Sequence, residues 1–71
     1  MTILRIALPI PKRQLFDYSY QGPPPKLGVR VQVPFGPRTM IGLLWEIADS
    51  STWPEDKLKA VIQVLDEQPV F

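Results

Sequence analysis

The chain has 71 residues, of which 45% are hydrophobic and 21% charged, and its formal net charge is +1. It contains no cysteine and no histidine, which excludes disulfides, a zinc site of the usual kind and an imidazole base. Its apolar runs are far shorter than the ~20 residues of a membrane helix. A chain this short predicts one small domain, residues 1–71, and the lack of cysteine fits a reducing cytoplasm.

The charges are distributed unevenly along the chain. Residues 1–45 hold six bases and one acid, a balance of +5, and residues 46–71 hold two bases and six acids, a balance of −4. The six bases are Arg5, Lys12, Arg13, Lys26, Arg30 and Arg38. Such asymmetry predicts a basic face that could meet phosphate, although ordinary charge scatter on a small domain would look similar.

Two strands are predicted near the amino terminus. Residues 3–8 alternate, with Leu4, Ile6 and Leu8 on one face. Prolines end this strand, because proline cannot donate to a β-ladder. Residues 15–20, LFDYSY, form a second extended segment with its aromatic side chains on one face and Asp17 on the other. The segment QGPPPKLG that follows is a loop.

A hairpin is predicted next. Residues 29–35 give the cleanest alternation in the chain, with three valines and Phe35 on one face. Gly36 and Pro37 make the turn. The returning strand places Ile41, Leu43, Trp45 and Ile47 on its apolar face, so we expect Trp45 in the core.

The last third predicts a helical turn and then a strand. Pro54 and the acids after it suit the start of a helix. Residues 58–65 fit helical and strand spacing equally well, but the β-branched content of AVIQV favours a strand. The predicted fold is mainly β: a small antiparallel partial barrel of four or five strands with one short helical turn.

The chain lacks the motifs of common enzymes. It has neither GxxxxGK[ST] nor GxGxxG, and its carboxylates show no spacing typical of an acid–base pair. Binding is therefore the expected function, and Asp17 is its most informative candidate. A carboxylate is a poor ligand for phosphate but accepts a hydrogen bond from a sugar hydroxyl, while aromatic neighbours can stack on a base. In the alternative interpretation Phe16 and Tyr18 are core residues and Asp17 is solvated.

Six segments follow one another along the chain: ALPIP, LFDY, a proline/glycine loop, VRVQVPFG, IGLLWEI and KLKAVIQVLDEQPVF. In this order and at these distances they resemble the N-terminal domain of the PriA family, the primosomal replication-restart DNA helicases of bacteria. The resemblance implies an OB-like β-domain that captures the 3′ end of the leading strand at a stalled fork and recognises its free 3′-hydroxyl. Its implied nucleic-acid-binding residues are Phe16, Asp17, Tyr18, Gly36 and Lys59.

The resemblance also implies a longer parent protein in the bacterial cytoplasm. That parent would be an ATP-dependent helicase with ATP, magnesium and zinc bound in domains beyond this chain, and with other primosome proteins and single-stranded DNA-binding protein as partners. The apolar ending, Val70 and Phe71, likewise predicts a fragment. A fragment short of its final strands would leave a β-edge open, so we expect some tendency to dimerise.

Two other functions remain open from the residues alone. PIPKR and PPPKL are typical of proline-rich ligands, which would make the chain an SH3-like or proline-rich protein-interaction module. A small barrel could also bind RNA or DNA generally, with no dependence on the strand's end.

Overall fold

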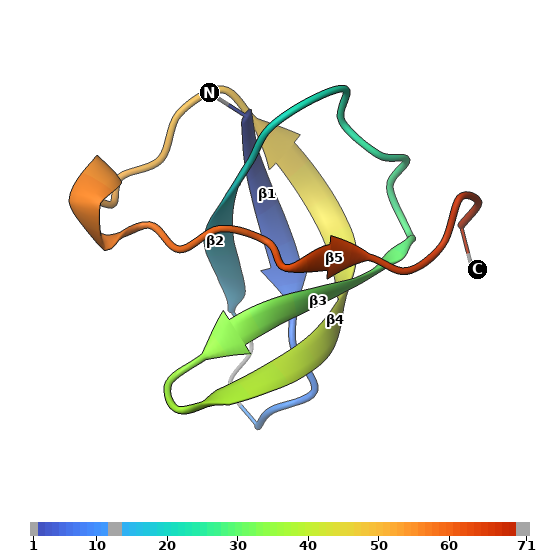
Figure 1. The fold of residues 1–71 in the computed structure, drawn as a ribbon, viewed down its shortest axis with the longest axis horizontal. Coiled ribbons are helices and arrows are strands. Elements are labelled where there is room, and N and C mark those ends of the chain that lie inside the picture. The colour runs from blue at the N-terminus through green and yellow to red at the C-terminus, as the bar shows by residue number, and fades with distance from the viewer. Residues whose placement is uncertain (1, 12–13, 70–71) are drawn as a thin grey trace.

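A computed structural model describes residues 2–11 and 14–69, which form five strands and one short helix (Figure 1). The elements are β1 (Thr2–Ala7), β2 (Leu15–Tyr20), β3 (Arg30–Phe35), β4 (Arg38–Ala48), the 3-10 helix η1 (Glu55–Lys57) and β5 (Gln63–Val64). Lys12 and Arg13, counted in the basic half, and the apolar ending Val70 and Phe71 lie outside the described residues. No helix in the described part of the chain is long and apolar enough to cross a membrane.

The strands form one antiparallel sheet in the order β2-β1-β4-β3-β5. The two edges of the sheet meet through the chain that precedes β5. The Ser19 N–H donates to the Lys59 carbonyl at 2.9 Å, and the Val61 N–H donates to the Ser19 carbonyl at 3.0 Å. Figure 1 shows this orange-red segment passing in front of β2 and continuing into β5, which pairs with β3. The predicted mainly β partial barrel is confirmed.

This closure bears on the expected open edge. Both backbone groups of Ser19, on edge strand β2, are already bonded to the segment 59–61. Part of the β2 edge is therefore already paired within the chain and is not open to pairing with a second copy, as the dimerisation prediction assumes. Dimerisation itself stays a prediction.

The core lies between the concave faces of the strands and contains the side chains predicted for β1 and β3. Its buried members are Leu4, Ile6, Leu8, Tyr18, Val29, Val31, Val33 and Leu44. The alternation of β3 is confirmed, and the hairpin turn consists of Gly36 and Pro37, since Phe35 pairs with Arg38. Gly36 has a φ of +61°, which suits glycine at the first position of a two-residue hairpin turn.

The predicted facing of β4 is wrong. Trp45 is 54% exposed and Ile41 50% exposed, whereas Gly42 and Leu44 are buried. The strand β1 crosses so closely at Gly42 that a Cβ there would lie 2.5 Å from the carbonyl oxygen of Ala7. Only glycine fits at this position. The face of β4 that contains Gly42 and Leu44 therefore turns toward the core, although the opposite face has more apolar side chains.

A β-bulge then changes the facing again. Arg5 pairs with Glu46 but the next residue, Ile6, pairs with Leu44, so Trp45 is the extra residue. A regular alternation along residues 41–47 therefore could not describe this strand. The apolar side chains that it leaves outside are ordinary surface residues for a small domain.

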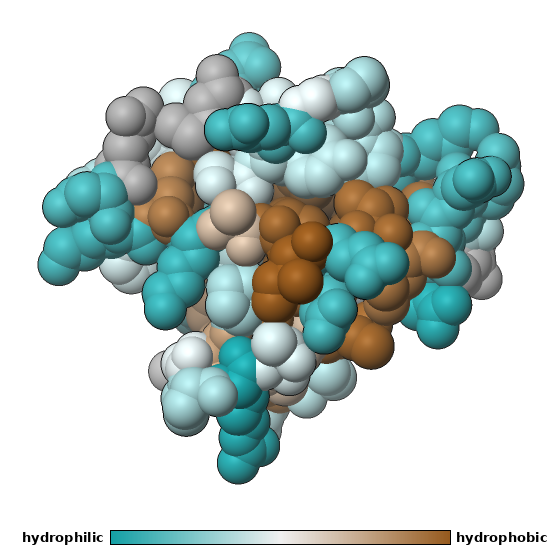
Figure 2. Space-filling model, in the orientation of Figure 1, coloured by the Kyte–Doolittle hydropathy of each residue, from teal (hydrophilic) through white to brown (hydrophobic). Residues whose placement is uncertain are grey.

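The predicted turn-then-strand in the last third is confirmed, although β5 has only two residues. The pairing with β3 extends through backbone bonds from Ile62 to the Gln32 carbonyl and from Leu65 to the Arg30 carbonyl, both 2.8 Å. Figure 2 shows apolar side chains at the surface over β5 and the chain beside it. Ile62, next to β5 in the sequence, is 51% exposed.

The uneven charges of the two halves partly cancel in space. Arg30 makes a bidentate ion pair with Asp66, and Arg5 pairs with Glu46. The Asp66 carboxyl has its pKa lowered by hydrogen bonds from the Arg30 side chain and backbone. Two of the expected basic residues are thus engaged with acids of the second half. The first 45 residues therefore present fewer uncompensated positive charges than their sequence balance of +5 suggests.

Candidate nucleic-acid interface

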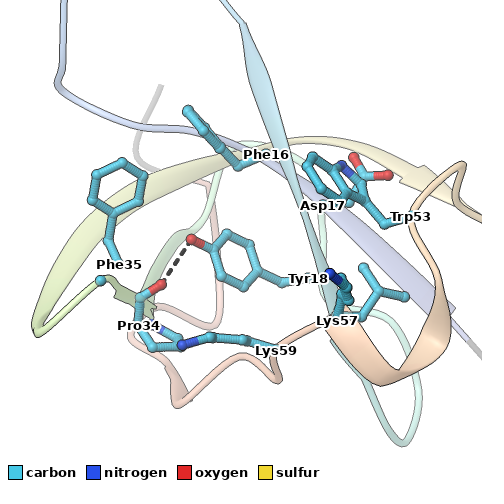
Figure 3. A pocket seen from close by; sticks show the side chains of 10 residues that line it. Phe16, Asp17, Tyr18, Pro34, Phe35, Trp53, Lys57 and Lys59 are labelled. Atoms are coloured by element: carbon cyan, nitrogen blue, oxygen red, sulfur yellow. Dashed lines mark hydrogen bonds between the residues drawn. The ribbon is translucent and has the colours of Figure 1, made fainter.

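A surface pocket of about 200 Å³ lies at the outer edge of β2, beside the hairpin turn (Figure 3). All five residues proposed from the resemblance line it: Phe16, Asp17, Tyr18, Gly36 and Lys59. They come from β2, from the turn after β3 and from the segment that closes the barrel. Residues distant in sequence are therefore brought together by the closure of the sheet.

The Asp17 side chain is only 11% exposed and has two partners. The Nε of Arg5 lies 3.5 Å from its Oδ1, and the Ser51 hydroxyl donates to its Oδ2. Arg5 is its register partner on β1, so this ion pair follows from the strand pairing. In the alternation of β2, Asp17 points away from Phe16 and Tyr18. It still borders the same pocket because β2 is the edge strand of the sheet.

Arg5 sits between two carboxylates. The pKa of Arg5 is raised, chiefly by the hydrogen bond to Glu46, with smaller contributions from the charges of Glu46 and Asp17. One guanidinium faces two carboxylates, so this group of three side chains carries a net charge of about −1 at neutral pH. The edge of the pocket at Asp17 is therefore locally negative.

Tyr18 is a core residue as well as a pocket residue. Its side chain is 5% exposed, and its hydroxyl donates to the Pro34 carbonyl at 2.8 Å. Burial raises the pKa of this phenol. The bond joins β2 to β3 beneath the pocket, as Figure 3 shows. For Tyr18 the structural interpretation holds, and little of its ring is free to stack on a ligand.

Phe16 packs against Phe35 at the hairpin. The two rings meet edge to face, with centroids 5.4 Å apart and an angle of 88° between their planes. Both side chains are half-buried and border the pocket. This geometry is one of the preferred arrangements of aromatic pairs, so it fixes the wall next to the turn.

Gly36 and Lys59 both border the pocket. No heavy atom lies within 4 Å of the position a Gly36 Cβ would take, so the chain itself leaves this space open. The Lys59 backbone is anchored by the bond from Ser19, and its side chain is exposed. A second exposed ammonium, that of Lys57, borders the same pocket. Two cations and a carboxylate thus border the same pocket.

Reasoning from the sequence missed half of the lining. The further residues are Pro34, Phe35, Trp53, Lys57 and Leu58. Trp53 lines the pocket together with Asp17 and is 57% exposed. Pro34 and Phe35 directly precede Gly36 in the sequence, so their closeness to that glycine could have identified them as pocket residues. No motif in the sequence points to Ser51 as a partner of Asp17.

A family model described as the PriA 3′DNA-binding domain (3′BD) matches residues 5–71. The chain belongs to this family. It is also 42% identical over 72 residues to the replication restart protein PriA of Haemophilus influenzae. That alignment covers 100% of the chain and 10% of the relative, so the chain spans about a tenth of the length of this PriA protein. The resemblance read from the six motifs is confirmed.

Proposed function

We propose that this PriA-type domain binds single-stranded DNA at its 3′-terminal nucleotide and recognises a free 3′-hydroxyl. The observation that carries the proposal is the Asp17 carboxylate, held in place at the edge of a pocket that also presents two lysines and aromatic side chains. The family match supports DNA as the ligand. The match and the pocket favour this function over a proline-rich interaction module.

Asp17 is suited to accept a hydrogen bond from a hydroxyl group. A carboxylate has about four lone-pair sites, and Ser51 uses one of them at Oδ2. A hydroxyl already bonds to this group, so a sugar hydroxyl could bond in the same manner. Such a bond to a charged acceptor contributes about 1.5–3 kcal/mol net. The constraint from Arg5 and Ser51 also limits the entropy lost when the ligand arrives.

The same group disfavours a phosphorylated end. A terminal phosphate adds a charge of about −1.5 to −2 at neutral pH. It would approach the cluster of Arg5, Asp17 and Glu46, whose net charge is about −1. Lys59 lines the same pocket, and Figure 3 shows its ammonium beside Pro34, away from Asp17. We propose that it holds the internucleotide phosphate of the terminal residue. The site therefore separates the hydroxyl end of the ligand from its phosphate.

Base identity contributes little to this recognition. Stacking on aromatic rings tolerates every base, because each base has a π-face. In the described lining of the pocket the polar side chains are Asp17, Lys57, Lys59 and the indole and phenol groups of Trp53 and Tyr18. Tyr18 already donates to Pro34. We propose weak binding with little base preference.

The wider role follows from the family. We propose that the domain places a replication-restart helicase at the leading-strand 3′ end of a stalled fork. The sequence has no triphosphate cradle and no zinc ligands of the usual kind, so we assign ATP, magnesium and zinc to other parts of such a protein. Other primosome proteins and single-stranded DNA-binding protein would act there too.

A titration of labelled oligonucleotides tests the site. Short strands ending in 3′-hydroxyl or 3′-phosphate would be titrated against the wild-type chain and Asp17→Asn, which keeps the shape and removes the charge. We expect the wild type to prefer the hydroxyl end roughly tenfold, and the variant to lose most of this preference. Equal affinity of the wild type for both ends would contradict the mechanism. An unchanged preference in Asp17→Asn would show that another group reads the end.

A further inference from the structure

Trp53 is the most exposed of the large hydrophobic side chains described, at 57%, and it stands in the candidate pocket. A single exposed apolar side chain is common and needs no explanation by itself. The position of this one is informative. Trp53 and Asp17 line the same pocket, and the Ser51 hydroxyl bonds to the Asp17 carboxylate and to the Trp53 backbone. Figure 3 shows both side chains at the same end of the pocket in this view, where we propose that the terminal sugar binds.

Several local contacts restrain the backbone at this tryptophan. Its backbone N–H donates to the Ser51 hydroxyl at 3.1 Å, and the same hydroxyl donates to Asp17. Pro54 follows, and a residue before proline is restricted to extended backbone. The Lys57 N–H then bonds to the Pro54 carbonyl at 2.9 Å as η1 begins. These contacts fix the backbone from which the indole projects, so less conformational entropy is lost when a ligand stacks on the ring.

The other aromatic rings of the pocket have less free surface. Tyr18 is 5% exposed, and the Phe16 ring is in edge-to-face contact with Phe35. A nucleobase buries its face most completely on a ring that is not already covered. Of the aromatic residues that line the pocket, Trp53 meets this condition best.

We propose that Trp53 is the stacking platform for the base of the 3′-terminal nucleotide. This inference rests on the function proposed above and assigns the base to a residue outside the FDY motif. Ser51 links the two parts of the site, since its hydroxyl bonds to the carboxylate that reads the sugar and accepts from the backbone of the residue that stacks on the base. Tyr18 supports the pocket from below.

A double-mutant cycle isolates this contact. Wild type and Trp53→Ala would be titrated with labelled oligonucleotides whose 3′-terminal nucleotide has a base or is abasic. We expect Trp53→Ala to lose roughly 5- to 100-fold in affinity for the intact strand and little for the abasic one. Trp53→Phe should recover much of the loss, because it restores an aromatic face. Trp45→Phe, on the outer face of β4, serves as the matched control.

Fluorescence gives a second readout. The chain has two tryptophans, so Trp45→Phe leaves Trp53 as the reporter and Trp53→Phe leaves Trp45. We expect DNA to quench the first variant and leave the second nearly unchanged. The inference is overturned if Trp53→Ala weakens intact and abasic strands equally, or if only Trp45 responds, while wild-type binding still requires a 3′-hydroxyl. If the wild type shows no such requirement, the proposed function fails first.

Discussion

Arg5 and Asp17 face one another across β1 and β2, and the arginine Nε lies 3.5 Å from the Asp17 Oδ1. Glu46 pairs with Arg5 on its other side, so one cation joins carboxylates from two neighbouring strands. The only acid among the first 45 residues is therefore the ion partner of a base on the adjacent strand. This pairing, together with the bond from Ser51, restricts the position of the carboxylate beside the pocket.

The charge of this group should control end selectivity. Arg5→Gln makes the site more negative, so we expect preference for a 3′-hydroxyl over a 3′-phosphate to increase. Glu46→Gln should decrease it, because Arg5 then neutralises Asp17 alone. The side chains of Arg5 and Glu46 are partly exposed, so each change should alter the unfolding free energy only slightly. Comparative titrations with both ends measure the effect, and changes of the same sign in both variants would contradict it.

The phenol of Tyr18 should stabilise the fold. Tyr18→Phe removes the donor to the Pro34 carbonyl inside the barrel, and we expect a loss of about 1–2 kcal/mol. In a domain of this size that lowers Tm by roughly 4–8 °C per kcal/mol. Tyr20→Phe is the control, since that hydroxyl makes no hydrogen bond within the described residues. Thermal melts followed by circular dichroism should separate the two, and equal Tm values would argue against the contact.

Acid should weaken the fold through Asp66. Its pKa in the folded state is lowered by Arg30, so the stabilisation from this pair is complete above the unfolded-state pKa of about 4. It is lost as the pH falls through the lower folded value. Asp66→Asn should therefore reduce stability at pH 7 and flatten its decline below pH 4. Urea midpoints measured from pH 7 to pH 2 test this, with Asp56→Asn as the control for removal of an exposed acid.

Two glycines should respond differently to alanine. At Gly42 the new Cβ would lie 2.5 Å from the Ala7 carbonyl oxygen and the Ile6 Cγ2, so we expect a loss of roughly 1–3 kcal/mol or more. At Gly36 the space is open and only the positive φ is unfavourable, which costs about 1–2 kcal/mol. Gly36→Ala should weaken DNA binding more than its stability loss explains. Denaturant midpoints and oligonucleotide titrations together distinguish the two effects.

The segment that closes the barrel should couple fold and site. Val61→Pro removes the N–H that bonds to the Ser19 carbonyl, and it should detach Lys59 from the pocket edge. We expect DNA affinity and barrel stability to fall together. Val61→Ala keeps the N–H and loses only side-chain packing, so it should retain the site. Amide hydrogen exchange at Ser19 reports the closure directly, and strong protection in Val61→Pro would contradict this role.

How far the sequence predicts this fold depends on the strand. In β3 every second residue faces the core, so the alternating valines alone predict which side chains are buried. In β4 the close approach of β1 at Gly42 and the bulge at Trp45 reverse the facing, and both are properties of two strands together.

Prediction of the site from the sequence is limited in the same way, because part of it depends on contacts between distant segments. Motif resemblance located Asp17 and Lys59, but the exposure of Trp53 and the bond from Ser51 depend on how a loop returns to β2.

The closure also sets an order of events during synthesis. Ser19 bonds to residues about forty positions later in the chain, so this contact has a large sequence separation and slow formation is expected. A ribosome must release residues 59–65 before the ring of strands can be completed. Until then the Asp17 carboxylate has no facing lysine, and a nascent chain has no place to hold a nucleotide. Competence to bind and completion of the fold should therefore arrive in the same step.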